Sequence, residues 1–366
     1  MSELPIRLVV LYGGQSAEHA VSCVSAAHVL KALDTERYEI DAVAITVDGH
    51  WVRSADVALA LGSGSDSIGG SLDATGDQVT PQSALAPLRT GQQVVVLPIL
   101  HGPRGEDGAI QGLLELADVA YVGTGVLGSA LNMDKAMAKT VAAANGLAQV
   151  QHIASRDTLI DHDLVERVAR ELGWPVFVKP SNLGSSVGVT RAGNPVELLD
   201  ALTTATSFDE WVVIEEAVNA REIEVGVIGN GSPRASVAGE IIPTHQFYDY
   251  EDKYLDGAAE MVVPADLPAE IAQQARELAV KAYTALRCDG LARVDFFYEE
   301  TAADGGAGRG LLFNEINTLP GFTPYSMFPS LWSATGLDYG ALLDELIALA
   351  VQRHTHRQPH RRQRHK

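Results

Sequence analysis

Four polar side chains near the C-terminus are spaced so that they could hold a cation. Arg293 and Asp295 lie two residues apart in one strand-like segment, and Glu315 and Asn317 lie two residues apart in the next. Because side chains alternate between the two faces of a strand, each pair shares one face. If the Gly- and Ala-rich stretch 301–310 closes a hairpin, the two pairs meet as a patch of two carboxylates, an amide and an arginine.

The oxygen atoms in this patch are the ligands that Mg²⁺ prefers. Proteins usually hold this ion with one or two carboxylates plus the phosphates of a substrate, rather than in a cage made of protein alone. The two segments taken by themselves would also fit the solvated outer face of a sheet. The hairpin therefore predicts either a magnesium site or a solvated face, depending on what lies opposite it.

A Gly- and Ser-rich loop, residues 179–188, follows a predicted strand and could close over phosphate oxygens with its backbone N–H groups. It is not a Walker loop, because its lysine precedes the Gly and Ser residues instead of opening a helix after them. The chain also has no GxGxxG dinucleotide motif. A plain turn is the alternative. Lys135 and Lys179 would supply positive charge for the phosphates.

Glu215 lies near the end of an apolar, strand-like run, residues 211–216. A carboxylate and adjacent backbone amides in this place could bind the exocyclic amine and the ribose hydroxyls of a nucleotide. This signal is weaker than the hairpin and the loop, and it supports the same kind of ligand.

The composition excludes several classes of partner. The 366-residue chain has a net charge of −20, although its last residues, 353–366, hold six Lys and Arg and no Asp or Glu. So acidic a body repels nucleic acid and anionic membranes. Cys23 and Cys288 have neither metal-ligand spacing nor a disulfide pattern, and no apolar run reaches about 18 residues. Met1 lies too close to the first strand for a signal peptide. We expect a soluble, cytoplasmic protein that binds neither nucleic acid nor membranes.

The elements that position these residues follow from the periodicity of the apolar residues. The first part of the chain is predicted to contain strand 7–12, helix 18–33, strand 38–45, strand 94–100 and helix 110–116. The second part is predicted to contain helix 135–146, helix 163–172, strand 175–179, helix 195–205 and strand 211–216. The third part contains helix 268–286, the hairpin and helix 339–351, whereas residues 62–92 form a surface connection.

Taken together, these residues resemble the D-alanine–D-alanine ligases of the ATP-grasp superfamily over nearly the whole chain. Five segments carry the resemblance: GGQSAEHAVS at 13–22, HG with GEDG at 101–108, KP with GSSVG at 179–188, RVD at 293–295, and NEINT with PG at 314–321. The resemblance implies an α/β (α+β) fold of three domains, two of which grip ATP between them.

The domain boundaries implied are an N-terminal open parallel α/β domain at 1–133, a central ATP-grasp domain at 134–221 and a C-terminal ATP-grasp domain at 222–352. We expect the basic, His-rich tail at 353–366 to be disordered. The resemblance further implies that ATP phosphorylates the carboxylate of one D-alanine and that the amine of a second D-alanine attacks the acyl phosphate. The dipeptide would feed peptidoglycan precursor synthesis, and a homodimer is expected on the same ground.

The resemblance also implies a role for each matched residue. Two Mg²⁺ ions, for which Mn²⁺ can substitute, would be held by Asp295, Glu315 and Asn317. ATP would be contacted by Lys135, Lys179, Ser185, Ser186, Glu215, Val218, Glu222 and Lys253, with Glu215 and Val218 at the adenine and Glu222 at the ribose. The residues implied in catalysis and substrate binding are Glu18, Ser185, Tyr254, Arg293, Gly321 and Ser326.

Among the catalytic residues, Arg293 and the backbone N–H of Gly321 match the pair that stabilises the tetrahedral oxyanion. Glu18 matches the carboxylate that holds the first ammonium group and forms a hydrogen-bonded triad with Ser185 and Tyr254. Ser326, with the N–H of Met327, matches the clamp on the second carboxylate. The resemblance places His101 near the substrates, and a structural role for it is an equal alternative.

Three other functions fit parts of the sequence. Related ligases join D-alanine to D-lactate or D-serine, but Tyr254 matches the pattern of the dipeptide-forming enzymes. An ATP-binding protein without ligase activity would not require Arg293 together with the metal ligands. A ligase for unrelated carboxylates would not explain Glu18 and Ser185 together with Tyr254. We therefore predict a ligase that joins two D-alanine molecules.

Overall fold

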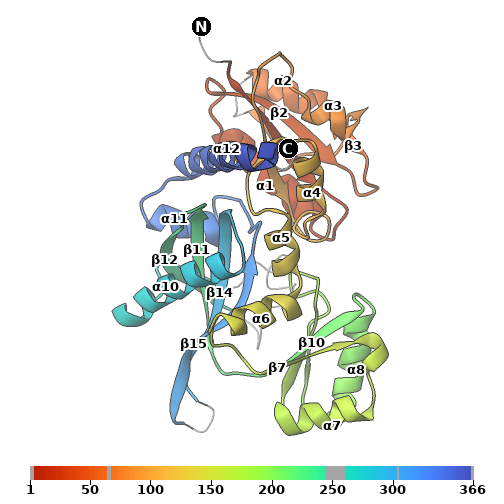
Figure 1. Cartoon of the computed structure of the whole chain (residues 1–366), viewed down its shortest axis with the longest axis vertical. Coiled ribbons are helices and arrows are strands. Elements are labelled where there is room, and N and C mark those ends of the chain that lie inside the picture. The colour runs from red at the N-terminus through yellow and green to blue at the C-terminus, as the bar shows by residue number, and fades with distance from the viewer. Residues whose placement is uncertain (1–3, 64–66, 244–259, 303–304, 364–366) are drawn as a thin grey trace.

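Three β-sheets organise the chain in the computed structural model, which describes residues 4–63, 67–243, 260–302 and 305–363. The first sheet lies at one end of the long axis and the second at the other, with the third sheet between them (Figure 1). The predicted α/β fold is confirmed, and the order of its elements follows the prediction.

The first sheet has the strand order β4-β3-β2-β1-β5-β6. Its elements are β1 (Ile6–Gly13), α1 (His19–Ala32), β2 (Tyr38–Ile45), β3 (Trp51–Arg53), α2 (Ala55–Ser63), β4 (Asp77–Val79), α3 (Pro81–Leu85), β5 (Val94–Leu100), α4 (Ala109–Leu116), β6 (Ala120–Tyr121) and α5 (Val126–Met133). Strands β2, β1, β5 and β6 are parallel, as predicted, and β3 and β4 add an antiparallel edge.

The stretch 62–92 is more ordered than a surface connection. It contains β4 and α3, and the side chains of Ile68 and Leu72 are buried in the core of the first sheet. Elements of three to five residues are too short to show a period in the sequence, so the prediction missed them.

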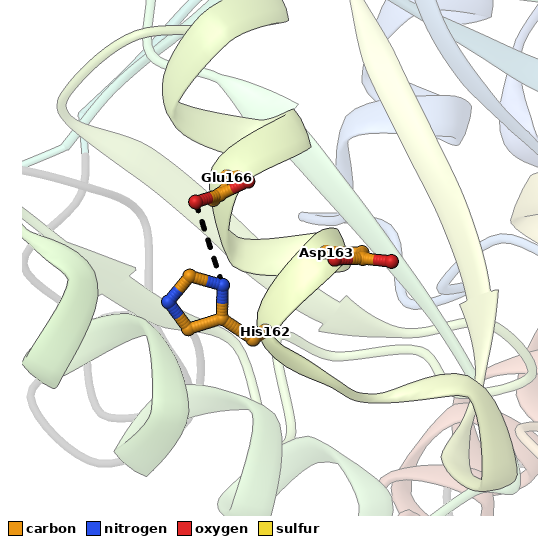
Figure 2. A group of neighbouring side chains, drawn as sticks. All are labelled: His162, Asp163 and Glu166. Atoms are coloured by element: carbon orange, nitrogen blue, oxygen red, sulfur yellow. Dashed lines mark ion pairs between the residues drawn. The ribbon is translucent and has the colours of Figure 1, made fainter.

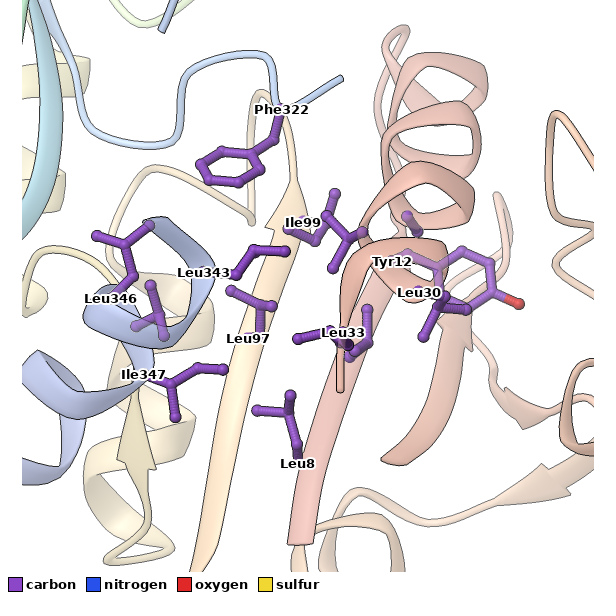
Figure 3. Close-up of a cluster of buried hydrophobic side chains, with 14 of the residues drawn as sticks. Leu8, Tyr12, Leu30, Leu33, Leu97, Ile99, Phe322, Leu343, Leu346 and Ile347 are labelled. Carbon is purple, nitrogen blue, oxygen red and sulfur yellow. The ribbon is translucent and has the colours of Figure 1, made fainter. Parts of the chain in front are cut away.

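The core of the first sheet joins both ends of the chain. Strands β1 and β5 are buried along nearly their whole length, as expected for parallel strands covered on both faces. Helices α1 and α12 (Tyr339–Gln363) pack against one face, and α3 and α4 pack against the other. Figure 3 shows Leu343, Leu346 and Ile347 of α12 beside Leu97 and Leu8. The C-terminal helix is therefore part of the core that supports the first sheet.

The second sheet has the order β7-β10-β8-β9 and is antiparallel. The elements of this region are α6 (Lys135–Ala144), β7 (His152–Arg156), η2 (Asp157–Leu159), α7 (His162–Glu171), β8 (Val176–Pro180), β9 (Thr190–Ala192), α8 (Pro195–Thr206) and β10 (Trp211–Glu216). Asp134 caps α6 by accepting a hydrogen bond from the N–H of Met137 at 3.0 Å. This cap fixes the start of α6 beside the loop that follows β8.

The third sheet has the order β13-β12-β11-β14-β15 and is also antiparallel. The elements of this region are β11 (Arg221–Gly229), β12 (Arg234–Ile242), β13 (Glu260–Val262), α10 (Ala269–Ala285), β14 (Gly290–Thr301), β15 (Ala307–Asn317), α11 (Met327–Ala334) and α12. The predicted hairpin is confirmed, because β14 pairs with β15 and brings Asp295 opposite Glu315.

A β-bulge at Asn314 changes the face of the sheet to which the last side chains of β15 point. The pairing shifts between Asp295 opposite Glu315 and Phe296 opposite Phe313, which leaves Asn314 as the extra residue. Phe313 and Ile316 both pack in the core although three positions separate them. Without the bulge, Glu315 would point into the core, because it lies an even number of residues from Phe313. The bulge thus directs Glu315 away from the core and toward the opposite face.

Two glycines allow α11 to lie flat on the third sheet. A Cβ atom at Gly226 would lie 2.8 Å from Nε1 of Trp332, and one at Gly239 would lie 2.7 Å from the sulfur of Met327. Both distances are shorter than Cβ atoms show in real contacts, so a larger residue at either position would force the side chain of Trp332 or Met327 to shift. The close packing fixes Ser326, which lies immediately before α11.

The predicted disordered tail at 353–366 is wrong for its described part, because α12 continues to Gln363. Arg353 is buried, donates hydrogen bonds to the carbonyl oxygens of Gly123 and Tyr121, and lies 4.3 Å from the centre of the Tyr121 ring. Arg357 pairs with Asp289 at 2.8 Å. Basic composition suggested a solvated tail, but these cations have specific acceptors on the acidic body.

We expect Arg353→Met to destabilise the fold, because it leaves two buried carbonyl groups without their donor. The free energy of unfolding should fall by about 1–3 kcal/mol, measured by urea denaturation. The matched substitution Arg156→Met removes an ion pair with Glu210 at the surface and should change stability by less than about 0.5 kcal/mol. Equal stability of wild type and Arg353→Met would show that the tail helix is not anchored through this side chain.

Candidate active site

A cavity of about 370 Å³ lies between the second and third sheets. It brings together most of the residues that the sequence singled out. The predicted residues that line it are Lys135, Lys179, Ser185, Ser186, Glu215, Val218, Glu222, Arg293, Asp295 and Glu315. Lys253 and Tyr254 lie outside the described residues. The loop after β8 and the hairpin therefore face one space, as a phosphate and metal site requires.

Two lysines hold Glu215 at the floor of the cavity. The ammonium of Lys139 lies 2.8 Å from one carboxylate oxygen, and that of Lys179 lies 2.7 Å from the other. Burial alone would raise the pKa of Glu215, but the two ammonium groups outweigh it and hold this pKa well below its usual range. Sequence reasoning missed Lys139, although its place four residues after Lys135 on one helix face was a usable signal.

Arg293 forms the centre of a second charged cluster. Its guanidinium donates two hydrogen bonds of 2.8 Å to the carboxylate of Asp295 and lies 2.9 Å from Glu224. Burial opposes the charge of Arg293, but the two carboxylates raise its pKa well above the usual value. The arginine is therefore a fixed cation within the cavity. Glu224 was not predicted, and its alternation with Glu222 along β11 was the available signal.

The predicted metal ligands offer hard oxygen atoms that fit Mg²⁺. Asp295 and Glu315 lie opposite each other across β14 and β15. Each carboxylate has a cationic neighbour, Arg293 for Asp295 and the ammonium of Lys135, at 3.3 Å, for Glu315. Asn317 accepts a hydrogen bond of 3.1 Å from the N–H of Leu319. The donor set suits a metal ion bound together with phosphate. Each carboxylate would then face both the metal ion and its basic neighbour.

The loop after β8 contacts the region of the first sheet through Ser185. Its hydroxyl donates a short hydrogen bond to the carboxylate of Glu18, which lies in the loop before α1. Ser185 and Ser186 have φ values of 53° and 57°, in the left-handed region that side chains other than glycine avoid. Strained backbone of this kind gathers at ligand clamps and loops that close over sites. Two members of the predicted triad are thus in contact.

Gly321 and Ser326, both predicted site residues, lie side by side. A Cβ atom at Gly321 would lie 3.1 Å from the Ser326 hydroxyl oxygen. Thr323 contributes both its backbone N–H, at 3.2 Å, and its hydroxyl, at 2.8 Å, to the same oxygen. The turn before α11 therefore carries a backbone N–H and a hydroxyl in one small space.

His101 connects this turn to the first sheet. Its Nδ1 donates to the carbonyl oxygen of Leu319 at 3.0 Å, and Glu106 lies 3.8 Å away. Burial lowers the pKa of the imidazole, but the neighbouring Glu106 reverses the effect and raises it. The contacts favour the structural alternative for His101, because the ring holds the backbone from which Gly321 follows.

A group of possible metal ligands lies outside the lining of this cavity. His162, Asp163 and Glu166 are exposed near the start of α7 (Figure 2), and His162 lies 3.5 Å from Glu166. Within the described ranges it is the one group of three His, Cys, Asp or Glu side chains with ligand atoms close together. Residues at these spacings meet on any helix surface, so the group carries no argument for a metal.

Two antiparallel sheets face each other across the cavity, with Lys179 and Glu215 on the second sheet and Arg293, Asp295 and Glu315 on the third. This is the arrangement that the resemblance to the ATP-grasp superfamily implies, and it places the protein among the ATP-grasp enzymes. Family models narrow the class. The model described as D-ala D-ala ligase N-terminus matches residues 7–124, and D-ala D-ala ligase C-terminus matches residues 141–348. The chain therefore belongs to the D-alanine–D-alanine ligase family.

Individual relatives agree with this assignment. The D-alanine–D-alanine ligase of Listeria monocytogenes is 44% identical over 95% of this chain and 96% of its own length. The same enzyme of Geobacillus kaustophilus is 42% identical over 95% of both chains. The predicted resemblance to this family is therefore confirmed over 95% of the chain.

Solved structures agree as well. The D-alanine–D-alanine ligase from Coxiella burnetii has a TM-score of 0.81 with 34% identity, covering 98% of this chain and 97% of its own. A D-Ala:D-Ser ligase from Enterococcus faecalis has a TM-score of 0.79 with 31% identity, covering 95% of this chain and 100% of its own.

Within the described ranges, none of the helices combines the length and the apolar character needed to cross a membrane.

Proposed function

We propose that this protein joins two D-alanine molecules into D-alanyl-D-alanine at the expense of ATP, for peptidoglycan precursor synthesis. The observation that carries the proposal is the placement of Arg293, the carboxylates of the hairpin and two lysines around one cavity, in a chain of the D-alanine–D-alanine ligase family. Phosphoryl transfer to a carboxylate needs cations around the phosphates, and attack on the acyl phosphate needs a cation at the oxyanion. The cavity offers groups for both.

Asp295, Glu315 and Asn317 would hold two Mg²⁺ ions, or Mn²⁺ in their place. When bound, the metal would supply positive charge that offsets the negative charge developing on the phosphate during transfer. The chain itself contributes the orientation of these oxygens, since the bulge at Asn314 turns Glu315 toward Asp295.

The nucleotide lies between the two sheets. Lys135 and Lys179 contact its phosphates, and Ser185 and Ser186 close over them from the loop after β8. The adenine lies at Glu215 and Val218 and the ribose at Glu222, all of which line the cavity. Lys253, outside the described residues, completes the predicted set.

The two D-alanine molecules lie beyond the phosphates. Glu18 binds the ammonium group of the first, and Arg293 with the N–H of Gly321 holds its carboxylate and then the tetrahedral oxyanion. Ser326, with the N–H of Met327, binds the carboxylate of the second. Its amine attacks the acyl carbon, and phosphate leaves with one of the original carboxylate oxygens.

The contact between Glu18 and Ser185, with Tyr254 as the third predicted member, closes the site against water. Closure matters because water would otherwise hydrolyse the acyl phosphate. We expect Ser185→Ala to raise the KM for the second D-alanine about tenfold, the value of one hydrogen bond to a charged group, and to release phosphate without dipeptide. Ser207→Ala, at the exposed end of α8, is the control. Tight coupling of ATP use to dipeptide in Ser185→Ala would remove this bond from the closure.

The acceptor is tested by identifying products with mass spectrometry. The enzyme would be supplied with ATP, Mg²⁺ and D-alanine, alone or with D-lactate or D-serine. We expect D-alanyl-D-alanine in every mixture. A mixed product as the main species would move the chain to the class of the Enterococcus faecalis D-Ala:D-Ser ligase or to the depsipeptide ligases.

The remaining proposals concern the state of the protein in the cell. We place it in the cytoplasm as a homodimer, with D-alanine and ATP as its ligands. Light scattering coupled to size exclusion tests the dimer, because the chain mass of 38.9 kDa distinguishes one copy from two.

A further inference from the structure

Helix α6 presents two lysines to the cavity region in different ways. Lys135 and Lys139 lie four residues apart and therefore share one face of the helix. The side chain of Lys135 is 14% exposed and lines the cavity, whereas that of Lys139 is 1% exposed and does not. Lys139 therefore cannot reach a nucleotide, and the roles proposed above do not account for a buried cation there.

What Lys139 does reach is Glu215. The carboxylate of Glu215, 3% exposed, gives one oxygen to Lys139 and the other to Lys179. Lys179 stands at the boundary of the cavity, since its side chain is 14% exposed and its ammonium lies 5.8 Å from the centre of the Phe297 ring on the third sheet. One carboxylate thus holds a fixed lysine on its buried side and an accessible lysine on its open side.

A phosphate that recruits Lys179 must draw it from Glu215. Breaking a buried ion pair by removing one partner is strongly unfavourable, because the remaining charge has lost both water and counter-charge. A second ammonium that stays on the carboxylate removes most of this cost. Burial lowers the pKa of Lys139 and Glu215 opposes that shift, as expected for a cation kept in place by this carboxylate.

We propose that Lys139 is a positioning residue for nucleotide binding: it keeps Glu215 paired while Lys179 moves to a phosphate. The inference rests on the proposed nucleotide site and assigns a task to a residue that contacts neither substrate nor metal. It separates two events at that site, adenine binding beside Glu215 and phosphate capture by Lys179. Only phosphate capture depends on Lys139.

The test compares ADP with adenosine in Lys139→Met. ADP carries phosphates that recruit Lys179, whereas adenosine carries none. We expect the variant to bind ADP about tenfold or more weakly than wild type does, as for other buried charge pairs that lose a partner, and to bind adenosine within about twofold of wild type. Calorimetry measures ADP, and competition against ATP measures adenosine. Lys281→Met is the control, because Lys281 contacts the exposed carbonyl of Gly146 and no carboxylate of the cavity.

Two results would overturn the inference. An equal loss of ADP and adenosine affinity would show that Lys139 only shapes the pocket, and unchanged ADP affinity would show that Lys179 needs no help to leave Glu215. The double variant Lys139→Met/Glu215→Gln should restore the ratio of ADP to adenosine affinity, because it also removes the carboxylate that Lys139→Met leaves poorly paired. A ratio that stays as low as in Lys139→Met would show that the loss does not act through Glu215. Wild-type protein that binds neither ligand would instead refute the proposed nucleotide site.

Discussion

Asp295→Asn and Glu315→Gln should each lower the rate of dipeptide formation by about 10³-fold or more, the scale of removing one element of charge stabilisation in phosphoryl transfer. Each substitution keeps the size of the side chain and removes the charge of one proposed Mg²⁺ ligand. Because the two residues face each other across β14 and β15, losing either should weaken the same metal site. The measurement is the rate of phosphate release at saturating ATP and D-alanine, with circular dichroism to show that the fold is intact.

Glu299→Gln is the matched control for both variants. Glu299 lies four residues after Asp295, on the same face of β14. Its carboxylate lies 2.6 Å from the guanidinium of Arg309, and neither side chain lines the cavity. Its loss should leave the rate within about twofold of wild type, as for a pair that makes no contact with the reacting groups. Wild-type activity in Asp295→Asn or Glu315→Gln would contradict the assignment of that residue as a metal ligand.

Arg293→Gln is expected to have the second-largest effect, a fall in kcat of about 10²–10³-fold, the range for removing one donor to an oxyanion. The residue is fixed between Asp295 and Glu224 before any ligand arrives, and such preorganisation is what makes a donor effective. The KM for ATP should change less than kcat does, because the proposed oxyanion forms only after phosphoryl transfer.

The control for Arg293→Gln is Arg309→Gln. Arg309 also bridges two carboxylates, Glu299 and Glu216, but it is more exposed, and it does not itself line the cavity as its partner Glu216 does. Its loss should lower stability slightly and leave kcat unchanged. If both variants lost kcat equally, the effect of Arg293 would be structural and the oxyanion role would be wrong.

The hairpin of this site could be predicted from the sequence because it depends on local periodicity, whereas the roles of the other site residues were implied by the resemblance to the ligase family. Strand alternation placed Arg293 with Asp295 and Glu315 with Asn317, and the Gly- and Ala-rich connector predicted that the two strands pair. The bulge at Asn314 could not be predicted, because it depends on which residues of β14 lie opposite β15.

The resemblance pointed to the contact between Glu18 and Ser185, but two other contacts between distant segments were missed for the same reason. Lys139 and Glu224 act through partners far away in the chain, Glu215 and Arg293, and neither stands out by composition. The tail was misread because a basic, His-rich stretch has the composition of a disordered segment. Its acceptors, such as the Tyr121 carbonyl and Asp289, become visible only once α12 lies against the first sheet.

The most direct test of the proposed reaction follows an oxygen atom. D-Alanine labelled with ¹⁸O in its carboxylate would be supplied with ATP and Mg²⁺, and the phosphate formed would be analysed by mass spectrometry. Ligation through D-alanyl phosphate predicts one ¹⁸O atom in each phosphate released, together with D-alanyl-D-alanine. Dipeptide with unlabelled phosphate would contradict the acyl phosphate, and phosphate without dipeptide would contradict the ligase itself.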